Sequence, residues 1–574
     1  MTNDSKSSYK ETPPVQRILQ QILQRVPGTL LILMIPFTLF TPRYAPDLFA
    51  FYYIALNIIF VLSVSRAVVG IWFAWHMAKT NLQLDSRDDI DHWIIIPNYK
   101  EDIETLSDTL EVLASHRMAK QRYKICLAME QGEKDSEKKA AQLIDEFSPY
   151  FAFVHFTHHP KNIPGEQRGK AANVAWAAKQ IATIMESSEL RSKTILTIQD
   201  ADTLLTADYF DKLSTLATAQ KETAHLHFYT PFNTFDRNSN SVPAIVRIMD
   251  ICLSVTQLST FLPYYPVSVP LSTYSLPFEL ANKVGWDSNG LAEDWHTALR
   301  LTFATNGALS QCNIVGSGTW YSDITAKRIQ VKRHYWGGVL EFSFFVSVAL
   351  LKMVGADTNV PVLEAEFLYP CERSRGQRVW DMGGRWVRLF LQGFHTLESL
   401  IWPIHALIIN VLAVIVIPGY GPAFMNALPN GWWKVLYGVE GASVPRVVAW
   451  IPTWMIYIQM LVIPVTVMVA VGYEGLYTWC SEGRWVAGSV EAGTLNRLGK
   501  KSAISNEVKR NWADMLDWIL FPIGLVYVIF QLCSSSLSQM LWGRLEYVVA
   551  AKPVIGGRPH NQPTSSQENL LEKA

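Results

Sequence analysis

Two aspartates that are one residue apart, Asp200 and Asp202, directly follow the apolar segment Thr194–Ile198. Such a segment is typical of a buried strand, and side chains at the carboxyl end of a parallel strand project into the crevice where α/β proteins bind ligands. Paired carboxylates suit a hard divalent cation, Mg²⁺ or Mn²⁺, which can hold a diphosphate. An isolated triplet of this kind is more often a solvated turn, so its position behind a buried strand is what favours a metal site.

A second acidic pair, Glu293-Asp294, lies at the start of a predicted helix. Acidic residues there commonly cap free backbone N–H groups, and for an isolated pair this structural role is the simpler interpretation. A hydroxyl nucleophile, however, needs a general base within hydrogen-bond reach, and a carboxylate beside a metal site could supply it. His296 follows two residues later, and for this histidine a role in the site and a structural role are equally open.

A third segment, Gln330-Val331-Lys332-Arg333-His334-Tyr335-Trp336, combines basic and aromatic side chains. An arginine can neutralise a departing diphosphate, and a flat aromatic ring can stack on a sugar. The alternative is a basic, aromatic segment at a membrane–water interface, where such residues are enriched.

Alternating strand-like and helical patterns must position these residues. Strand and helix alternate at a spacing that predicts a mostly parallel sheet with helices on both faces. The strand-like segments are His92–Pro97, Tyr123–Met129, Phe151–Phe156 and Thr194–Ile198, and the helical patterns are Glu104–His116, Lys134–Phe147 and Gly169–Ile184.

The composition of the 574-residue chain excludes some functions and favours others. Lys+Arg and Asp+Glu both number 50, so the neutral balance gives no reason to expect a nucleic acid as partner. The chain has 20 Trp, 22 Tyr and 26 Phe, an aromatic content that suits a protein with membrane interfaces to line. Six scattered cysteines without a CxxC pair argue against a zinc site and a disulfide scaffold.

Five apolar runs are candidate membrane spans, and each of the first two is about the length needed to cross a hydrocarbon core of ~30 Å. The Arg66 side chain is expected to reach the lipid headgroups near the inner end of the second run. The positive-inside rule places the N-terminus and the basic loop Tyr477–Arg510 in the cytosol, and an odd number of spans then places the C-terminal tail outside. The five runs are Val26–Thr41, Leu48–Val69, Leu400–Ile417, Val447–Val471 and Met515–Cys533.

Two further segments, Gly338–Val354 and Trp380–Phe394, are interpreted as helices in the membrane interface. A crossing at the first would bury Glu341 in lipid and place five downstream arginines outside, which the positive-inside rule disfavours. The alternative is that both are ordinary buried helices of the soluble domain.

Together and in this order, the motifs resemble those of family 2 glycosyltransferases, which have a GT-A fold. The likeness is to the membrane-embedded branch that contains cellulose, chitin and hyaluronan synthases and glucosylceramide synthase. It covers roughly Trp93–Trp336 and the general plan of spans on both sides. The matching segments are Pro97-Asn98-Tyr99-Lys100-Glu101 for P-x-Y-N-E, Gly169-Lys170-Ala171-Ala172-Asn173 for GKA(x)N, Asp200-Ala201-Asp202 for DxD, Glu293-Asp294 for the T/x-E-D motif, and Gln330 with Arg333 for QxxRW.

The resemblance implies a role for each matching residue, with Asp294 as the catalytic base. Glu130 ends the second strand where the family usually has aspartate. His334 replaces the tryptophan of QxxRW, and no clear counterpart of the FxVTxK gating loop is present. The implied donor-binding residues are Tyr99, Glu101, Glu130, Lys170, Asp200, Gln330 and Arg333, the metal ligands are Asp200 and Asp202, and the acceptor-binding residues are Trp295, His334 and Trp336.

The expected organisation is an α/β, Rossmann-like GT-A domain at 90–336 inserted between transmembrane helices. A cytosolic segment at 1–25 and two transmembrane helices at 26–75 precede this domain. Interfacial helices at 337–396, three transmembrane helices at 397–535 and a partly disordered tail at 536–574 follow it. The protein is therefore expected to be a multi-pass membrane protein whose catalytic domain is cytosolic.

The expected activity is a metal-dependent, inverting transfer of a sugar from a nucleotide sugar, with a UDP-sugar as the expected donor. The first hypothesis is extension of a polysaccharide, as in cell-wall synthesis, coupled to its secretion. The alternative is a single transfer to a membrane lipid, which the modest number of spans and the missing gating loop favour. A membrane scaffold with an inactive domain is the third, and the presence of every motif carboxylate disfavours it. Membrane lipids are expected partners, and a homo-oligomer is left open.

Overall fold

The computed structural model describes the chain from residue 12 to residue 543 in separate ranges. The described ranges are 12–79, 89–164, 166–167, 169–185, 187–205, 207–219, 224–235, 242–262, 270–306, 313–318, 324–363, 375–416, 464–478 and 512–543. Most of the predicted span Val447–Val471 and of the basic loop Tyr477–Arg510 lies outside these ranges, as does the tail beyond Gly543.

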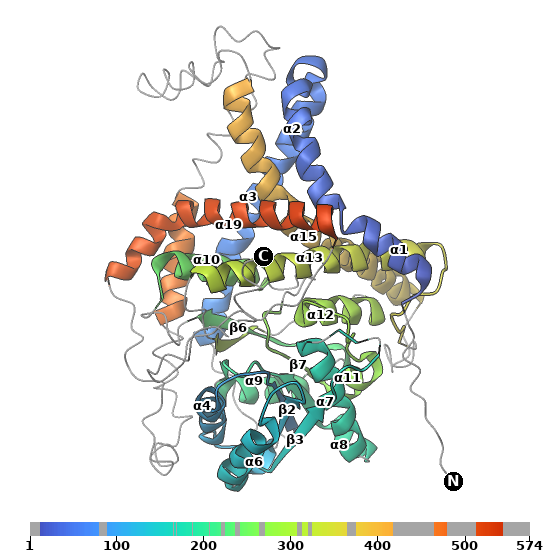
Figure 1. Ribbon diagram of the computed structural model, residues 1–574, viewed down its shortest axis with the longest axis vertical. Coiled ribbons are helices and arrows are strands. Elements are labelled where there is room, and N and C mark those ends of the chain that lie inside the picture. The colour runs from blue at the N-terminus through green and yellow to red at the C-terminus, as the bar shows by residue number, and fades with distance from the viewer. Residues whose placement is uncertain are drawn as a thin grey trace.

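A five-stranded sheet with the order β3-β2-β1-β4-β7 forms the centre of the α/β domain, in the lower half of Figure 1. The first four strands along the chain are parallel, and β7 is antiparallel to β4. The predicted α/β domain with a mostly parallel sheet is therefore confirmed. The strands are β1 (Asp91–Pro97), β2 (Tyr123–Glu130), β3 (Phe153–His159), β4 (Thr194–Ile198) and β7 (Tyr274–Pro277).

Helices cover both faces of this sheet because alternate strand residues point to opposite sides. Ile95 of β1 packs with Val174 and Ile181 on one face, whereas Ile94 packs with Leu110 on the other. The helices of the domain are α4 (Ile103–Ala114), α5 (Ala119–Arg122), α6 (Ser136–Phe147), α7 (Lys170–Ile184), α8 (Ser188–Ser192), α9 (Ala207–Ala219), α11 (Phe278–Val284) and α12 (Glu293–Ala304), with short 3₁₀ turns η1 (Ser148–Tyr150) and η2 (Ala224–Leu226).

The strand order reverses between β1 and β4. The chain proceeds from β1 outward to β2 and β3, and then returns to place β4 on the other side of β1. Ligands of open α/β sheets bind at such a point, beyond the carboxyl ends of the strands. Here these ends lead into Asn98-Tyr99 and into Asp200, so the predicted donor and metal residues lie at the expected edge.

A second sheet has the order β5-β8-β6 and was not predicted. β5 is only two residues long and begins two residues after Asp202, so it is too short to show an alternating pattern in the sequence. Its strands are β5 (Leu204–Leu205), β6 (Thr230–Phe235) and β8 (Asn313–Gly318).

Long helices lie at the opposite end of the molecule from the five-stranded sheet, in the upper half of Figure 1. Among the residues that the structure describes, four helical segments are long and apolar enough to cross a membrane: 14–44, 46–76, 327–353 and 516–542. The helices are α1 (Pro14–Leu23), α2 (Val26–Tyr44), α3 (Pro46–Lys79), α10 (Ala244–Leu258), α13 (Ile324–Met353), α15 (Arg375–Val416) and α19 (Leu516–Trp542), and the 3₁₀ turn η6 (Trp512–Met515) precedes α19.

α3 extends well beyond the predicted span Leu48–Val69. Its 34 residues make a helix of ~51 Å. Ala67, Ile71 and Ala74 in its last third pack in a buried cluster with residues of the α/β domain. Arg66 does not reach outward as expected, because its guanidinium binds both oxygens of Glu398 from α15 at 2.6 and 2.7 Å.

The two segments predicted as interface helices belong to longer helices. Gly338–Val354 falls almost entirely within α13, which is largely buried and contacts both α12 and α19. The carboxyl group of Glu341 is fully buried, and it is surrounded by protein and not by lipid. Trp380–Phe394 lies in α15, a single 42-residue helix that continues through most of the predicted span Leu400–Ile417.

α19 contains the last predicted span, yet it lies crosswise to α2 and rests on α10 and α13 (Figure 1). α2 and the carboxyl-terminal part of α15 instead run side by side away from the α/β domain (Figure 1). The apolar helices therefore have two directions, which hydropathy alone does not distinguish.

Candidate functional site

Lys170 joins three elements where β4 ends and where α7 and α12 begin. Its ammonium lies 2.7 Å from Asp200 Oδ1 and 3.2 Å from Glu293 Oε2. The buried Glu293 also accepts a hydrogen bond from the Tyr274 hydroxyl, which in turn accepts one from Trp286 Nε1 at 2.6 Å. These contacts hold Lys170 and the first aspartate of the triplet in one polar network.

The charges in this network stabilise one another. Burial opposes the charged form of Lys170, but the carboxylates of Asp200, Glu293 and Asp294 outweigh it and raise the pKa of this ammonium above its usual value. Burial raises the pKa of Glu293, and the nearby ammonium opposes that effect. Lys170 therefore stays a cation at the edge of the site.

The backbone of Ser272 connects the same lysine to Asp294. The Ser272 carbonyl accepts a hydrogen bond from Lys170 Nζ at 2.7 Å, and its N–H donates to Asp294 Oδ2 at 2.8 Å. The other oxygen of Asp294 accepts the N–H of Trp295 at 2.9 Å. Ser272 has φ +62°, a left-handed conformation that is uncommon for a residue with a Cβ. This local strain turns both backbone groups toward the site.

Asp200 and Asp202 stand on a short turn after β4. The N–H of Thr203 donates to the Asp200 carbonyl at 3.0 Å, and Thr109 of α4 donates to the Ala201 carbonyl at 2.6 Å. The Asp202 side chain is nearly buried, with 9% of its residue surface exposed, whereas Asp200 is half-buried. The turn therefore has a fixed position relative to the sheet.

The two aspartates fit a hard divalent cation in ligand type, since both offer carboxylate oxygens. No group of three or more His, Cys, Asp or Glu suited to a metal occurs among the residues that the structure describes. A cation here would thus complete its coordination with oxygens from water or from a bound diphosphate, as Mg²⁺ commonly does.

The loop after β1 carries Tyr99 and Glu101, and hydrogen bonds to Glu133 fix its backbone. One oxygen of Glu133 accepts hydrogen bonds from Asn98 Nδ2 at 2.8 Å and from the N–H of Lys100 at 2.9 Å. Lys100 has φ +61°, and its ammonium lies 5.2 Å from the centre of the Tyr99 ring. These contacts with Glu133 give the loop a defined conformation.

Two further contacts complete this side of the site. The Lys139 ammonium, which pairs with Glu133, donates to the carbonyl of Glu101 at 2.8 Å. Glu130 is buried at the end of β2, opposite His159 of β3. Both residues lie at the carboxyl edge of the sheet.

The start of α12, which bears Glu293 and Asp294, is pressed against α13. A Cβ added at Gly337 of α13 would lie 2.6 Å from the Cβ of Ala292, so only glycine permits this approach. One turn into α12, His296 contacts α13 a second time through Glu341. The position of Asp294 therefore depends on α13.

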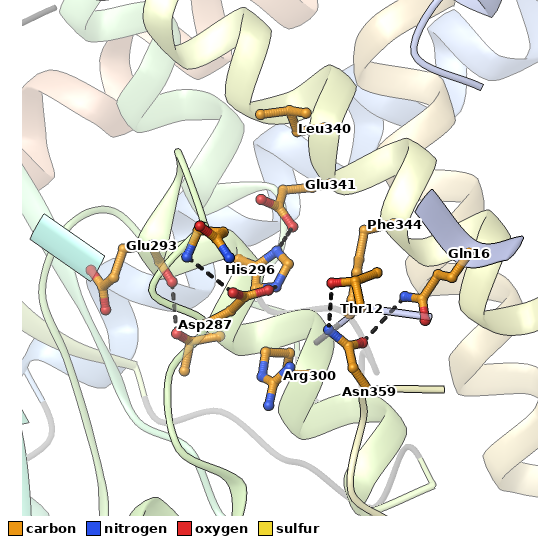
Figure 2. Close-up of polar contacts among 12 residues, drawn as sticks. Thr12, Gln16, Asp287, Glu293, His296, Arg300, Leu340, Glu341, Phe344 and Asn359 are labelled. Atoms are coloured by element: carbon orange, nitrogen blue, oxygen red, sulfur yellow. Dashed lines mark hydrogen bonds and ion pairs between the residues drawn. The ribbon is translucent and has the colours of Figure 1, made fainter. Parts of the chain in front are cut away.

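Figure 2 shows His296 between two carboxylates, Asp287 and Glu341. Its Nδ1 lies 2.5 Å from Glu341 Oε2, and its Nε2 lies 3.1 Å from Asp287 Oδ2. Burial alone would lower the pKa of His296, but Glu341 and Asp287 outweigh it and raise this pKa to about 9. The doubly protonated imidazole therefore links the loop before α12 to α13.

The aromatic and basic residues at the start of α13 have different surroundings. Gln330 is buried and accepts a hydrogen bond from Lys327 at 2.5 Å. Arg333 is half-buried and His334 is exposed. Trp336 is buried, and its indole N–H donates to the Ser535 carbonyl of α19 at 3.1 Å. Within the described residues, the indole of Trp336 is thus engaged by α19, whereas Trp295 lies half-buried beside Asp294.

Several residues of this network had no recognisable sequence signal. Ser272 acts through its backbone, which leaves no trace in residue type. Tyr274 is 19 residues from the nearest motif, and Asp287 and Glu341 lie near motifs without belonging to one. The sequence marked Glu341 only as a polar group in an apolar run, and the fold is what brings these side chains to α12. For His296, the structure shows a structural linkage next to the site, which was one of the two interpretations left open.

Comparisons with known proteins give weak likenesses. No protein-family model matches the chain, and neither does any curated protein. Mannosyltransferase PcManGT from Pyrobaculum calidifontis, in complex with GDP-Man and Mn²⁺, is 12% identical, with 73% of this chain and 97% of that chain covered and a TM-score of 0.39. Glucosyl-3-phosphoglycerate synthase from Mycobacterium tuberculosis, with Mn²⁺, UDP and phosphoglyceric acid, is 12% identical, with 49% and 86% covered and a TM-score of 0.30.

A third solved structure is S. aureus TarS 1-349 in complex with UDP. It is 11% identical, with 65% of this chain and 92% of that chain covered and a TM-score of 0.28. All three TM-scores are below 0.5, so these likenesses decide neither the fold nor the activity of this chain.

Proposed function

We propose that this chain is a metal-dependent, inverting glycosyltransferase that moves a sugar from a nucleotide sugar, a UDP-sugar, onto a growing polysaccharide. One observation supports this most strongly. Lys170, Asp200 and Asp294 are brought together by contacts of 2.7 to 2.8 Å at the carboxyl edge of the sheet, next to the β1–β4 switch point. Separated by as many as 124 residues along the chain, they converge where α/β folds bind ligands.

Asp294 is the proposed general base. Its carboxylate is oriented by two backbone N–H groups, those of Ser272 and Trp295. In the proposed reaction this carboxylate takes the proton of an acceptor hydroxyl while the hydroxyl oxygen attacks the anomeric carbon. The bond from that carbon to the diphosphate breaks on the opposite face, which gives inversion.

The proposed donor site lies on the other side of the network. Tyr99 and Glu101, on the loop held by Glu133, are placed to contact the nucleoside. Lys170, with Arg333 of α13, would neutralise the departing diphosphate. Asp200 and Asp202 would hold Mn²⁺ or Mg²⁺, which when bound supplies positive charge to the diphosphate oxygens. Glu130 and Gln330 remain proposed donor-site residues, and Trp295, His334 and Trp336 remain proposed acceptor-site residues.

The test of this proposal uses the full-length protein purified in detergent. It measures release of nucleoside diphosphate from a panel of nucleotide sugars with Mn²⁺ or Mg²⁺. We expect release from at least one donor and none with EDTA. Glu189→Gln, which removes an exposed carboxylate of α8, serves as a matched control and should keep full activity. No release from any donor would contradict the proposal.

Transfer to a membrane lipid is the second candidate. The start of α12 rests on α13, and α13 packs on the apolar helix α19, so Asp294 lies on the side of the α/β domain that contacts the long helices. This placement suits a lipid as well as a membrane-bound glycan. The product separates the two candidates: a polymer that stays out of organic solvent supports polysaccharide synthesis, whereas a single glycolipid that extracts into it supports lipid transfer.

A further inference from the structure

The two faces of α19 differ sharply in chemistry. One face carries four polar side chains separated by 14, 4 and 4 residues, and all of them are buried: Asp517, Gln531, Ser535 and Gln539. The opposite face is apolar and exposed, with Ile519, Ile523, Val526 and Phe530 between 54% and 71% exposed. A helix that segregates its side chains in this way lies at a boundary between two environments.

The polar face is bound to the rest of the protein from one end of α19 to the other. At the start, Arg247 of α10 binds both oxygens of Asp517 at 2.8 and 2.9 Å. Near the end, Tyr335 of α13 hydrogen-bonds Ser536, and Gln539 donates to Gln24 beyond α1 at 3.3 Å.

In the middle, Gly524 allows close contact with α10. A Cβ added there would lie 2.3 Å from Cγ2 of Ile248. α10 follows directly after β6 and packs on it, so it belongs to the α/β domain. α19 is therefore attached along its length to a layer that includes part of the soluble domain.

α19 lies next to the ends of α2 and α3 that are nearest the α/β domain. Gly28, in the first turn of α2, would place a Cβ 2.7 Å from the Ser536 carbonyl, so α2 begins against α19 and rises away from it (Figure 1). On α3, Gly70 contacts the end of α10, one turn after the Arg66–Glu398 ion pair. Charged pairs and close helix contacts thus mark this level as the end of the apolar layer on the side of the α/β domain.

We infer that α19 does not cross the membrane but lies in its plane, in the lipid leaflet nearest the α/β domain. The partner is the lipid of that leaflet, whose acyl chains would contact the exposed apolar face of α19. α1 extends the same surface, because Val15, Ile18 and Ile22 form an exposed stripe while Gln16 faces the protein and donates to Asn359.

This arrangement changes the topology expected from hydropathy. A spanning α19 places residues 479–511 and the tail 544–574 on opposite sides of the membrane. An in-plane α19 places both on the same side, with the α/β domain.

Depth measurements test the inference directly. The full-length protein, with its native cysteines replaced, carries a single nitroxide-labelled cysteine in vesicles of phosphatidylcholine and phosphatidylserine. The variants are Ile519→Cys, Ile523→Cys, Val526→Cys and Phe530→Cys, and the accessibility of each label to oxygen and to a water-soluble nickel chelate gives its depth. We expect all four depths to agree within one helical turn, ~5 Å.

α3 provides a matched control in the same molecule. Phe51, Ile58 and Leu62 are exposed on a helix that rises from the layer, and residues 51 and 62 are as far apart along the chain as residues 519 and 530. Labels on α3 should differ in depth by up to ~16 Å over these eleven residues. An equal gradient along α19 would overturn the inference.

A second measurement needs no cysteine replacement. Short epitopes are inserted after Ser489 and after Ser566 in separate chains with native cysteines, and antibody access is compared in sealed and permeabilised vesicles. We expect both epitopes on the same side as an epitope at the N-terminus. Access from opposite sides would show that α19 crosses, and the in-plane placement would be wrong.

Discussion

At the scale of single residues, the carboxylates of the candidate site are held in different ways. Asp200 is paired with the ammonium of Lys170, and Asp294 accepts hydrogen bonds from two backbone N–H groups. Asp202 is nearly buried on the turn that connects β4 to β5. Three similar side chains therefore have three environments. Each should respond differently when its charge is removed.

Asp202→Asn should abolish sugar transfer while leaving folding nearly intact. A neutral amide replaces a charged oxygen ligand, and a hard cation binds carboxylates in preference to amides. Activity should also vanish with EDTA and return with Mn²⁺ or Mg²⁺. Asp145→Asn, at an exposed position of α6, is the control and should be fully active. Undiminished transfer in EDTA would show that the two aspartates do not serve a metal.

Asp294→Asn should reduce turnover by at least ~10²-fold, the lower end of the effect of losing a general base. Donor binding should change little, because the Ser272 N–H that orients Asp294 can still donate to the amide oxygen. Steady-state kinetics and donor binding by calorimetry measure the two effects separately. If donor affinity fell while turnover persisted, Asp294 would be a binding residue.

The places of Asp200 and Asp294 in the fold agree with the sequence analysis, because each lies at the end of a recognisable element. Asp200 stands after a strand of five buried residues, and Asp294 stands at the start of a helix. Ser272 could not be predicted, since any residue able to adopt φ +62° offers the same N–H and carbonyl. Backbone groups carry no residue type, so this part of the site becomes visible only in the fold.

At the scale of elements, the contact between α12 and α13 controls the site. His296 is the charged link in this contact, with its pKa raised from 6.5 to about 9. A folded-state pKa above the unfolded value gives stability that is fully present below pH ~6.5 and is lost as the pH rises through ~9. The full effect is about 3 kcal/mol.

The thermal stability of the wild type should therefore fall between pH 7 and pH 9.5. In Glu341→Gln one of the two carboxylates is neutral, so the pKa of His296 should drop and this part of the pH dependence should shrink. Thermal unfolding in detergent across that range measures the difference. Parallel curves for the two proteins would show that the imidazole charge does not stabilise the contact.

Adjacent glycines in α13 give a matched pair for the same contact. Gly337→Ala places a methyl group 2.6 Å from Ala292 Cβ and must move the start of α12, whereas Gly338→Ala meets its nearest atom, Leu400 Cδ2, at an ordinary 3.4 Å. We expect Gly337→Ala to reduce kcat at least ~10-fold, since small misplacements of catalytic groups are costly. Gly338→Ala should stay within twofold. Equal activities would show that Asp294 does not depend on this approach.

The elements themselves were predicted closely where they are buried on both sides. β4 has the predicted limits, and β1 and β2 differ by one residue at one end, because continuous apolar runs between polar turns have only one interpretation in an α/β pattern. The extension of α3 was missed because its last third is apolar for a different reason, namely contact with the α/β domain.

At the scale of the whole molecule, hydropathy predicts how long an apolar helix is but gives no information on its direction. α2 and α19 have similar apolar character, yet one rises from the helix layer and the other lies across it (Figure 1). The difference comes from tertiary contacts such as Arg247 with Asp517, whose partners are 270 residues apart. Sequence patterns within a single helix cannot contain that information.

The ion pair between Arg66 of α3 and Glu398 of α15 joins two of the long helices, which precede and follow the α/β domain along the chain. Glu398 is 4% exposed and also contacts His395 at 3.5 Å. A buried pair costs much desolvation, so removing both charges is tolerated better than removing one, which leaves an unpaired charge and costs ~3–5 kcal/mol.

Glu398→Ala should therefore lower the unfolding temperature clearly, because the half-buried Arg66 then loses this carboxylate. The double variant Arg66→Met/Glu398→Leu, of similar volume and without either charge, should be more stable than the single variant. Thermal unfolding of the wild type, Glu398→Ala, Arg66→Met and the double variant in one detergent gives the comparison, and Glu189→Gln again controls for loss of an exposed carboxylate. The contradicting outcome is a double variant that is less stable than Glu398→Ala by the full effect of Arg66→Met alone. The two side chains would then act independently, and apolar packing would hold α3 and α15 together instead.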